Sequence, residues 1–365
     1  MSPLLRRDGA AREALLMGAV AVVLLGLPWI LPWIGGYREL ATRIVIWSIF
    51  ALGFDILVGF TGFLSFGHAA FWGIGAYFAG YYLLHVTSNV LSAMLVGTAA
   101  ASLAAVLLGH LTLRRHGIYF AILTLAFAEM FYYAVLAPLQ QWTGGENGLT
   151  GLPSPTLFGL AFDKDSIHYF VSAWAFLAVY IARRIARSPY GLILRAVRSN
   201  EMRLRFTGID VYRYKVLAFI VSGVYAGLAG TLYAIYETYV PTLSLHWETS
   251  GKVVMMAVIG GIGTLFGPMI GAGIVLYLEN VLSAATDQWL LVQGAIFMLF
   301  VIFLPGGVAE GVRRVLAWAG RRHPAAAGTA AAVGPAAPPP SAAPAAQEEP
   351  ARAPAVGGAR LRRSS

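Results

Sequence analysis

The chain has 365 residues, of which 58% are hydrophobic and only 12% are charged, and its formal net charge is +9. This balance lies outside the range of ordinary soluble domains, and with a mean hydropathy of +0.69 it predicts an integral membrane protein. The absence of cysteine excludes a disulfide framework and a thiolate metal site.

Long apolar runs follow one another from residue 15 to residue 304. A helix needs roughly 20 apolar residues to span a bilayer, whereas strands of a membrane barrel alternate in polarity, so these continuous runs predict helices. The runs lie at residues 15–34, 42–61, 68–85, 90–113, 117–137, 168–185, 214–236, 243–262, 265–282 and 288–304. The predicted fold class is therefore an all-α integral membrane protein with about ten transmembrane helices.

The first 14 residues carry Arg6, Arg7 and Arg12 ahead of an apolar run, an order that is also typical of a signal peptide. The run continues to Ile34 without a small-residue cleavage pattern, and it is long enough to span a bilayer. We therefore expect it to be kept as the first span, with residues 1–14 as a cytosolic N-terminus.

Charged residues are distributed unevenly among the connections. Arg114 and Arg115 lie in one connection and a cluster of Arg and Lys fills residues 183–215, whereas the connection at 137–166 is mainly acidic. Because basic connections stay on the cytosolic side, this asymmetry places the first two inside and the acidic one outside. The same placement favours membrane lipid over nucleic acid as the partner of the excess positive charge.

Residues 243–282 are open to two interpretations, either two helices joined at residues 260–265 or one long span with a flexible middle. The first part also contains His246, Glu248 and Lys252, which are costly to expose to lipid. An even number of spans puts the basic residues near both ends on one side. We therefore predict two helices here, ten spans in all and both termini in the cytosol.

The transmembrane domain is expected to cover residues 15–305. After Gly320 the composition changes to Ala, Pro and Gly, with three consecutive prolines at 338–340. Such a segment buries too little apolar surface to offset its ordering entropy. We predict that residues 306–365 form a cytosolic tail, disordered after about residue 320. A tail that contacts lipid or a partner protein stays open.

Motifs for catalysis are absent from the sequence. It contains no G-x-x-x-x-G-K-[ST] phosphate loop, no H-E-x-x-H metal motif and no G-x-S-x-G nucleophile motif. The chain is therefore predicted to be no enzyme, to hold no cofactor or metal and to lack an ATP site of its own.

The basic connection at residues 188–210 has the pattern of one or two short helices outside the membrane. Pro189 suits a helix start and Gly208 a helix end. Between them, one apolar side is predicted to consist of Leu192, Ala196, Met202 and Phe206. This side has to be covered, either by lipid headgroups or by a groove on a cytosolic partner.

Four blocks of sequence within roughly residues 40–305 carry a family resemblance. They are Leu52-Gly53 with Gly59, Gly62, Leu64-Ser65-x-Gly67-His68-Ala69 and Gly73-x-Gly75-Ala76-Tyr77; Gly117-Ile-Tyr-Phe-Ala121 with Glu129 and Thr143-Gly144-Gly145-x-Asn147-Gly148-Leu149-x-Gly151; Ser188-Pro189-x-Gly191, Arg195-Ala196-x-Arg198, Asn200-Glu201 and Gly208-Ile209 with Tyr214-Lys215; and Gly260-Gly261-x-Gly263-Thr264-x-x-Gly267-Pro268-x-x-Gly271. Together these blocks resemble LivH/LivM-type branched-chain amino acid permeases, and the second block is similar to the LivM branch in particular.

The resemblance implies a permease subunit of an ATP-driven ABC importer of branched-chain amino acids or similar small solutes, in a bacterial inner membrane. It also implies a second homologous permease subunit, two cytosolic ATPase subunits that hydrolyse the ATP, and an extracytoplasmic substrate-binding protein. The segment 188–210 then couples ATPase closure to the helices, through Ser188, Pro189, Gly191, Arg195, Ala196, Arg198, Asn200, Glu201 and Gly208. The sequence departs from the family in the bulky residues 202–206.

Other residues are candidates for the translocation pathway or for helix packing. The pathway candidates are Ser65, His68, Glu129 and Glu248, and the packing candidates are Gly223, Gly227, Gly267 and Gly271. Each has a plainer alternative. Ser65 and His68 lie among glycines that suit a tight bend, Glu129 can bond a neighbouring helix, and Glu248 is spaced to pair with Lys252.

Three rival functions remain. A secondary transporter would use broken, glycine-rich helices and buried carboxylates such as Asp55 and Glu129 for ion coupling. A passive channel would need only glycine-lined helices and few buried charges. A permease of the same type specific for urea or amides is the third. The first two leave the basic segment at 188–210 unexplained.

Overall fold

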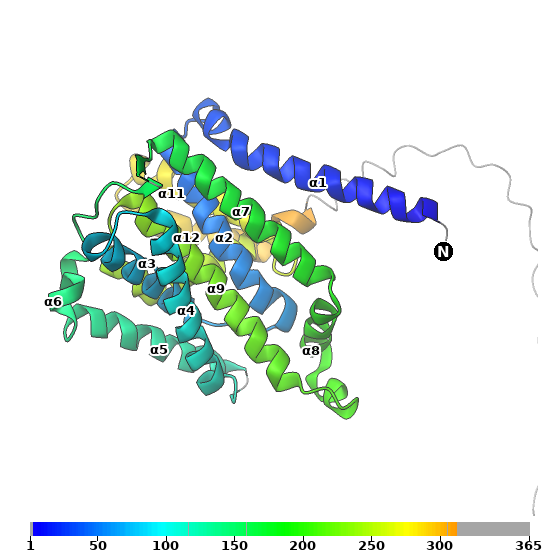
Figure 1. Cartoon of the computed structure of the whole chain (residues 1–365). Helices are drawn as coiled ribbons and strands as arrows, with labels where there is room; N and C mark the ends of the chain where they lie inside the picture. Colours follow the sequence, from blue (N-terminus) through cyan, green and yellow to red (C-terminus); the bar gives the residue numbers. More distant parts are fainter. Residues whose placement is uncertain (1–2, 116, 158, 305, 312–365) are drawn as a thin grey trace, which may run out of the picture. The chain divides into compact units, whose positions relative to one another are not determined.

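The structure is a computed structural model that describes residues 3–115, 117–157, 159–304 and 306–311 (Figure 1). Its main helices are α1 (Pro3–Ile30), α2 (Arg38–Thr61), α3 (His68–His85), α4 (Val90–Thr112), α5 (Ile118–Leu136), α7 (Lys164–Arg187), α8 (Pro189–Phe206), α9 (Val211–Glu237), α10 (Trp247–Gly260), α11 (Gly267–Ala285) and α12 (Trp289–Phe303). The short elements are η1 (Leu31–Ile34), α6 (Gln140–Thr143), η2 (Gly145–Asn147), β1 (Thr156–Leu157), β2 (Leu160–Ala161) and η3 (Thr242–Leu245).

The described residues are mostly helical, which confirms the helical membrane-protein class. Each of the ten predicted apolar runs overlaps one α-helix, although α1 starts well before residue 15 and α10 and α12 have only 14 and 15 residues. Seven of these helices are long and apolar enough to cross a membrane, namely α1, α2, α4, α5, α7, α9 and α11. Because α3, α10 and α12 do not meet both criteria, the count of ten spans stays a prediction. The predicted tail after residue 320 lies outside the described residues.

The predicted division of residues 243–282 into two helices is confirmed. α10 ends at Gly260 and α11 begins at Gly267. Leu265 between them has a φ of 66°, a left-handed conformation that no helix can continue through. α10 itself starts only at Trp247, because η3 and an extended residue, His246, precede it.

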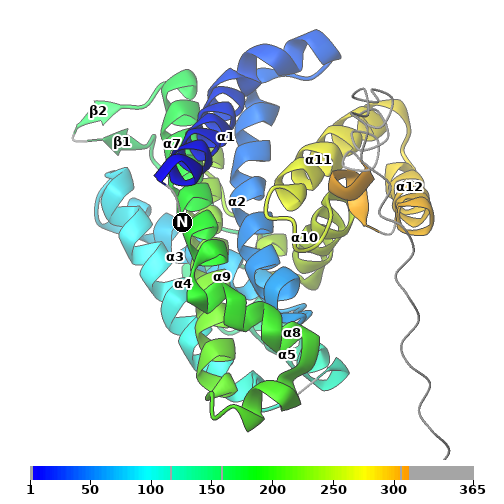
Figure 2. The same ribbon diagram turned by 90° about the vertical axis from the view of Figure 1, so that its right-hand side faces the viewer.

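The core is built around α2, whose whole apolar stretch is buried by the other helices. It packs against α9, α7 and α11 along its length and against α8 near its end, while α3, α4 and α9 pack on one another (Figure 2). α1 also joins this core, because Leu24 is buried and Glu13 bonds Arg183 and Arg187 of α7 at 3.2 and 2.6 Å.

Small residues allow these helices to approach closely. Gly223 and Gly227 of α9 face Ala105 and Ala101 of α4, so that an added Cβ on either glycine would overlap the alanine Cβ. Gly267 and Gly271 of α11 approach the backbone at the end of α10 in the same way. In lipid, helix association depends on such close van der Waals packing, because burial of apolar surface gives little driving force between helices.

We predict that Gly227→Leu destabilises the protein by about 1–3 kcal/mol, because the new side chain has to displace α4. The matched control is Gly294→Leu on α12, where nothing lies within 4 Å of an added Cβ. Thermal unfolding of the purified chain in detergent should show a lower Tm for the first variant only. Equal Tm values would contradict the packing role.

Candidate functional site

The start of α8 is fixed by side-chain capping and by close approach to α7. The Ser188 hydroxyl accepts a hydrogen bond from the Gly191 N–H at 3.2 Å, and Pro189 occupies the first helical position, where no N–H is needed. Gly191 is buried, and a Cβ there would lie 2.8 Å from the Ala186 carbonyl oxygen. The chain can therefore reverse from α7 into α8 without an intervening loop.

Asn200 and Glu201 divide α8 and hold its second half. Asn200 has non-helical φ and ψ of −163° and 97°, and its side-chain oxygen accepts from the Arg203 N–H at 2.9 Å, so it caps a new helical piece. Glu201 accepts from the buried Lys215 of α9 at 3.0 Å and from Arg205 at 2.6 Å. The Asn-Glu pair thus makes a kink and attaches it to α9.

Tyr190 forms a further contact between α8 and α9. Its ring stacks on Tyr214 at 5.7 Å, and its hydroxyl donates to the Tyr214 carbonyl at 3.2 Å. Burial, followed by the nearby Tyr214, raises the pKa of Tyr190, so the hydroxyl stays protonated and keeps donating this bond.

Two arginines attach α8 to the end of α2. Arg198 donates to the Gly59 carbonyl at 2.5 Å, and Arg195 lies 5.0 Å from the centre of the Phe60 ring. Gly59 and Phe60 belong to the last turn of α2, whose final carbonyls lack intrahelical partners. A guanidinium at this position suits both the free carbonyl and the negative end of the helix dipole.

Asp55, one helical turn before Gly59, attaches the same end of α2 to the loop between α10 and α11. Its two carboxylate oxygens accept from the Gly263 and Leu265 N–H groups at 2.6 and 3.2 Å, and the side chain is fully buried. Arg198 also lies close to Gly263. α8, α2 and residues 261–266 therefore form one continuous set of contacts.

The predicted apolar side of α8 is left largely uncovered by this chain, and a second apolar side packs on the bundle. Leu194 and Val197 are buried against the bundle, whereas Leu192, Met202 and Phe206 are 68%, 60% and 85% exposed. The kink at Asn200 rotates the second half, so the 3.6-residue spacing does not extend across it. The three exposed side chains are not covered by the rest of this chain.

His68 lies deep in the bundle at the start of α3. Its Nε2 is 2.7 Å from the Ser222 hydroxyl, and that hydroxyl donates to the Gly53 carbonyl at 2.7 Å. Because a hydroxyl has one proton, Nε2 must carry the hydrogen of its own bond. Aromatic rings of Phe54 and Phe71 surround the imidazole at 5.1 and 5.7 Å.

Ser65 forms part of the bend at residues 62–67 between α2 and α3. Its hydroxyl accepts from the Gly67 N–H at 3.2 Å. Neighbouring helices bond the same stretch of backbone, since Thr124 of α5 accepts from Phe66 at 3.2 Å and Ser250 of α10 from Ala69 at 2.8 Å. Ser65 and His68 are both fully buried, which fits the tight bend; a pathway role for them stays a prediction.

Glu129 and Glu248 both lie at the start of α10, on either side of His246. Glu129 of α5 accepts from the Trp247 N–H at 3.1 Å, which satisfies a free donor at the positive end of that helix. His246 lies between the two carboxylates, 4.0 Å from Glu129 and 3.9 Å from Glu248. The predicted pair of Glu248 with Lys252 is wrong, because Lys252 instead binds Glu279 of α11 at 2.5 Å.

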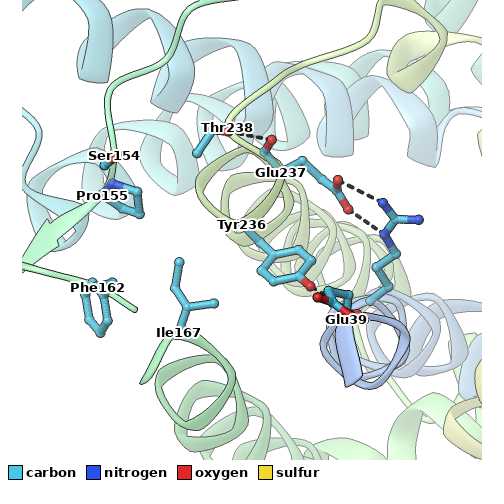
Figure 3. Close-up of a pocket in the computed structure, with 9 residues that line it drawn as sticks. Glu39, Ser154, Pro155, Phe162, Ile167, Tyr236, Glu237 and Thr238 are labelled. Carbon is cyan, nitrogen blue, oxygen red and sulfur yellow. Dashed lines mark hydrogen bonds and ion pairs between the residues drawn. The ribbon is translucent and has the colours of Figure 1, made fainter. Parts of the chain in front are cut away.

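An ion pair that local sequence spacing does not predict lies at the opposite end of α9 from α8. Arg43 of α2 binds Glu237 of α9 through two bonds of 2.6 and 3.0 Å (Figure 3). The pair lines a cavity of about 400 Å³ that Pro155 and Phe162 border on the other side. This pairing explains how Glu237 is tolerated at the end of an apolar run.

We predict that Asp55→Asn destabilises the chain by about 1–3 kcal/mol, because an amide has one acceptor oxygen for two backbone donors. The control is Asp210→Asn at the exposed cap of α9, where Asn caps as well as Asp does. Hydrogen exchange at residues 261–266 should rise in the first variant only. Unchanged exchange there would disprove the role assigned to Asp55.

Comparisons with known proteins agree with the resemblance seen in the sequence. Residues 36–301 match a family model described as the permease component of branched-chain amino acid transport systems. The chain is 30% identical to the high-affinity branched-chain amino acid transport system permease protein LivM of Salmonella typhimurium, over 84% of this chain and 77% of that relative. It is 28% identical to the protein of the same name from Escherichia coli, over 80% and 75%.

A more partial similarity reaches another transport system. The autoinducer 2 import system permease protein LsrC of Klebsiella pneumoniae is 26% identical over 47% of this chain and 52% of its own length. No solved structure matches the chain significantly.

Proposed function

The chain belongs to the family of branched-chain amino acid transport permeases, and we propose on that premise that it is the transmembrane subunit of an ATP-driven importer. The substrates are branched-chain amino acids, moved into the cytosol of a bacterial cell. The observation that carries this proposal is α8, a helix with three exposed apolar side chains that is bonded to α2, α7 and α9.

The partners follow from the same helix and from the family. Two cytosolic ATPase subunits supply the ATP hydrolysis, and one of them covers Leu192, Met202 and Phe206 of this chain. A second homologous permease completes the membrane part, and an extracytoplasmic binding protein delivers the substrate. In this arrangement α8 and both termini face the cytosol, and the strands β1 and β2 face outward.

ATPase closure reaches the membrane helices through the bonds of α8. Arg198 transmits displacement of the helix to Gly59, and Asp55 carries it from α2 to residues 261–266 at the end of α10. Glu201 and Lys215 carry it to α9. Because each contact is a short, charge-assisted bond, α8 moves these three elements together.

The test of this function is purification of the chain from its native membrane in mild detergent, followed by leucine uptake in liposomes. We expect two ATPase subunits and a second permease to co-purify, and uptake to require ATP and the binding protein. Gradient-driven uptake by the chain alone would favour a secondary transporter, and downhill flux alone a channel. Transport of urea or amides in preference to leucine would favour the third rival.

We predict that the double variant Leu192→Ala, Phe206→Ala weakens ATPase association by about tenfold or more, because buried apolar anchors dominate such interfaces. The matched control is Leu103→Ala, Leu299→Ala, which removes exposed apolar side chains from α4 and α12. Co-purified ATPase per chain is the measurement. Equal loss in both variants would show that α8 is not the docking helix.

We predict that Arg198→Met leaves the ATPases bound but lowers uptake per ATP hydrolysed by about tenfold, since the bond to the end of α2 is lost. Arg203→Met, on the exposed side of the same helix, is the control. Gly191 is a poorer position to test coupling, because any side chain there displaces α8 from α7. Normal uptake in the Arg198 variant would place the coupling elsewhere.

A further inference from the structure

A cavity of about 620 Å³ lies between α2, α3 and α9 on one side and α10, α11 and α12 on the other. These last three helices pack on one another, as Figure 2 shows on its right-hand side. We call it the aromatic cavity and define it by six of its lining residues, most of them aromatic: Trp47, Trp72, Tyr233, Trp247, Lys252 and Glu279. Its volume is in the range of small-molecule sites.

The aromatic rings form a continuous wall. Trp47 and Trp72 lie with their centres 4.7 Å apart, and Tyr233 follows at 5.3 Å from Trp72. Trp47 and Trp72 are 8% and 1% exposed and so form the back of the cavity, whereas Trp247 is 45% exposed and offers its ring to an apolar side chain. The faces of such rings also attract cations. The Lys252 ammonium already uses this property, because it lies 4.8 Å from the centre of a Trp47 ring.

One ion pair stands at the edge of this wall. The Lys252 ammonium binds the Glu279 carboxylate at 2.5 Å, the two side chains are 23% and 30% exposed, and both line the cavity. Opposite charges placed within apolar helices are costly to insert into a bilayer, and they usually mark a site of function. The packing of α10 on α11 does not require them, because glycines make that contact.

We propose that the aromatic cavity binds a free α-amino acid as its zwitterion, with the ammonium group on Glu279, the carboxylate on Lys252 and the side chain against Trp47 and Trp247. A zwitterion inserted into the ion pair gives each charge a new partner, so no charge is left unpaired. A singly charged solute leaves one of the two unpaired, and a neutral amide leaves both without a charged partner. The inference rests on the proposed function and specifies the chemical form of its substrate.

The test uses the complex purified from membranes, washed free of the extracytoplasmic binding protein and placed in lipid nanodiscs. Binding of radiolabelled L-leucine is measured in competition with unlabelled L-leucine, its methyl ester, N-acetyl-leucine and 4-methylpentanamide. These compounds share the side chain and differ in charge. We expect L-leucine to compete at least about tenfold better than each of the others.

Variants locate the site. Lys252→Met and Glu279→Gln should each weaken leucine binding by about tenfold or more, and so should the double variant Lys252→Met, Glu279→Met, which removes both charges and leaves none unpaired. The control is Glu237→Gln, which breaks the ion pair with Arg43 outside the aromatic cavity and should keep full binding. Monodisperse size-exclusion profiles identify the variants that are folded.

Full binding by the folded double variant would overturn the inference, and so would equal competition by the ester or the amide. An absence of leucine binding to the unaltered complex at about 10 mM would overturn it as well. The proposed function fails separately. If uptake does not require ATP but leucine binding still depends on Lys252, the proposed importer function is rejected and the binding site stands. If uptake requires ATP but the Lys252 and Glu279 variants bind leucine normally, the binding site is rejected and the importer function stands.

Discussion

Backbone that leaves helical geometry inside a bilayer has no water to bond, and the arrangement of this protein follows from that constraint. Its helices are interrupted at residues 62–67, 238–246 and 261–266, and a side chain from another helix meets each break. Thr124 and Ser250 serve the first, Glu129 the second and Asp55 the third. Four polar residues within the apolar runs, Asp55, Thr124, Glu129 and Ser250, are thereby accounted for by the breaks they satisfy.

The same hydrogen bonds also connect the three helix breaks to one another. Ser250 belongs to the first turn of α10, which Glu129 caps, and the far end of α10 leads into the connection that Asp55 holds. Arg198 adds α8 to this set through the last turn of α2. The contacts therefore run from the exposed helix α8 to α10, which borders the aromatic cavity, through few intervening groups.

Hydropathy predicted the helices well because the length of a span is set by the bilayer, and the helix limits agree with most runs within a few residues. The start at residue 243 was wrong by four residues, because η3 is as apolar as a helix and turns before Trp247. Partners across helices were not predictable. Local spacing paired Lys252 with Glu248, whereas packing pairs it with Glu279 of another helix. The inner side of α8 could not be told from the outer one, because Leu194 and Val197 on the buried side are as apolar as Leu192 on the exposed side.

The bond between Asp55 and Gly263 joins residues 208 positions apart in the sequence. At a synthesis rate of about 5–20 residues per second, Gly263 is made on the order of 10–40 s after Asp55. Throughout this interval the Asp55 carboxylate lacks the Gly263 and Leu265 N–H donors that it binds in the folded chain, and lipid supplies none. Exposure of this carboxylate to acyl chains is therefore costly while α9, α10 and α11 are still being made, and the cost ends only when residues 263–265 pack against α2.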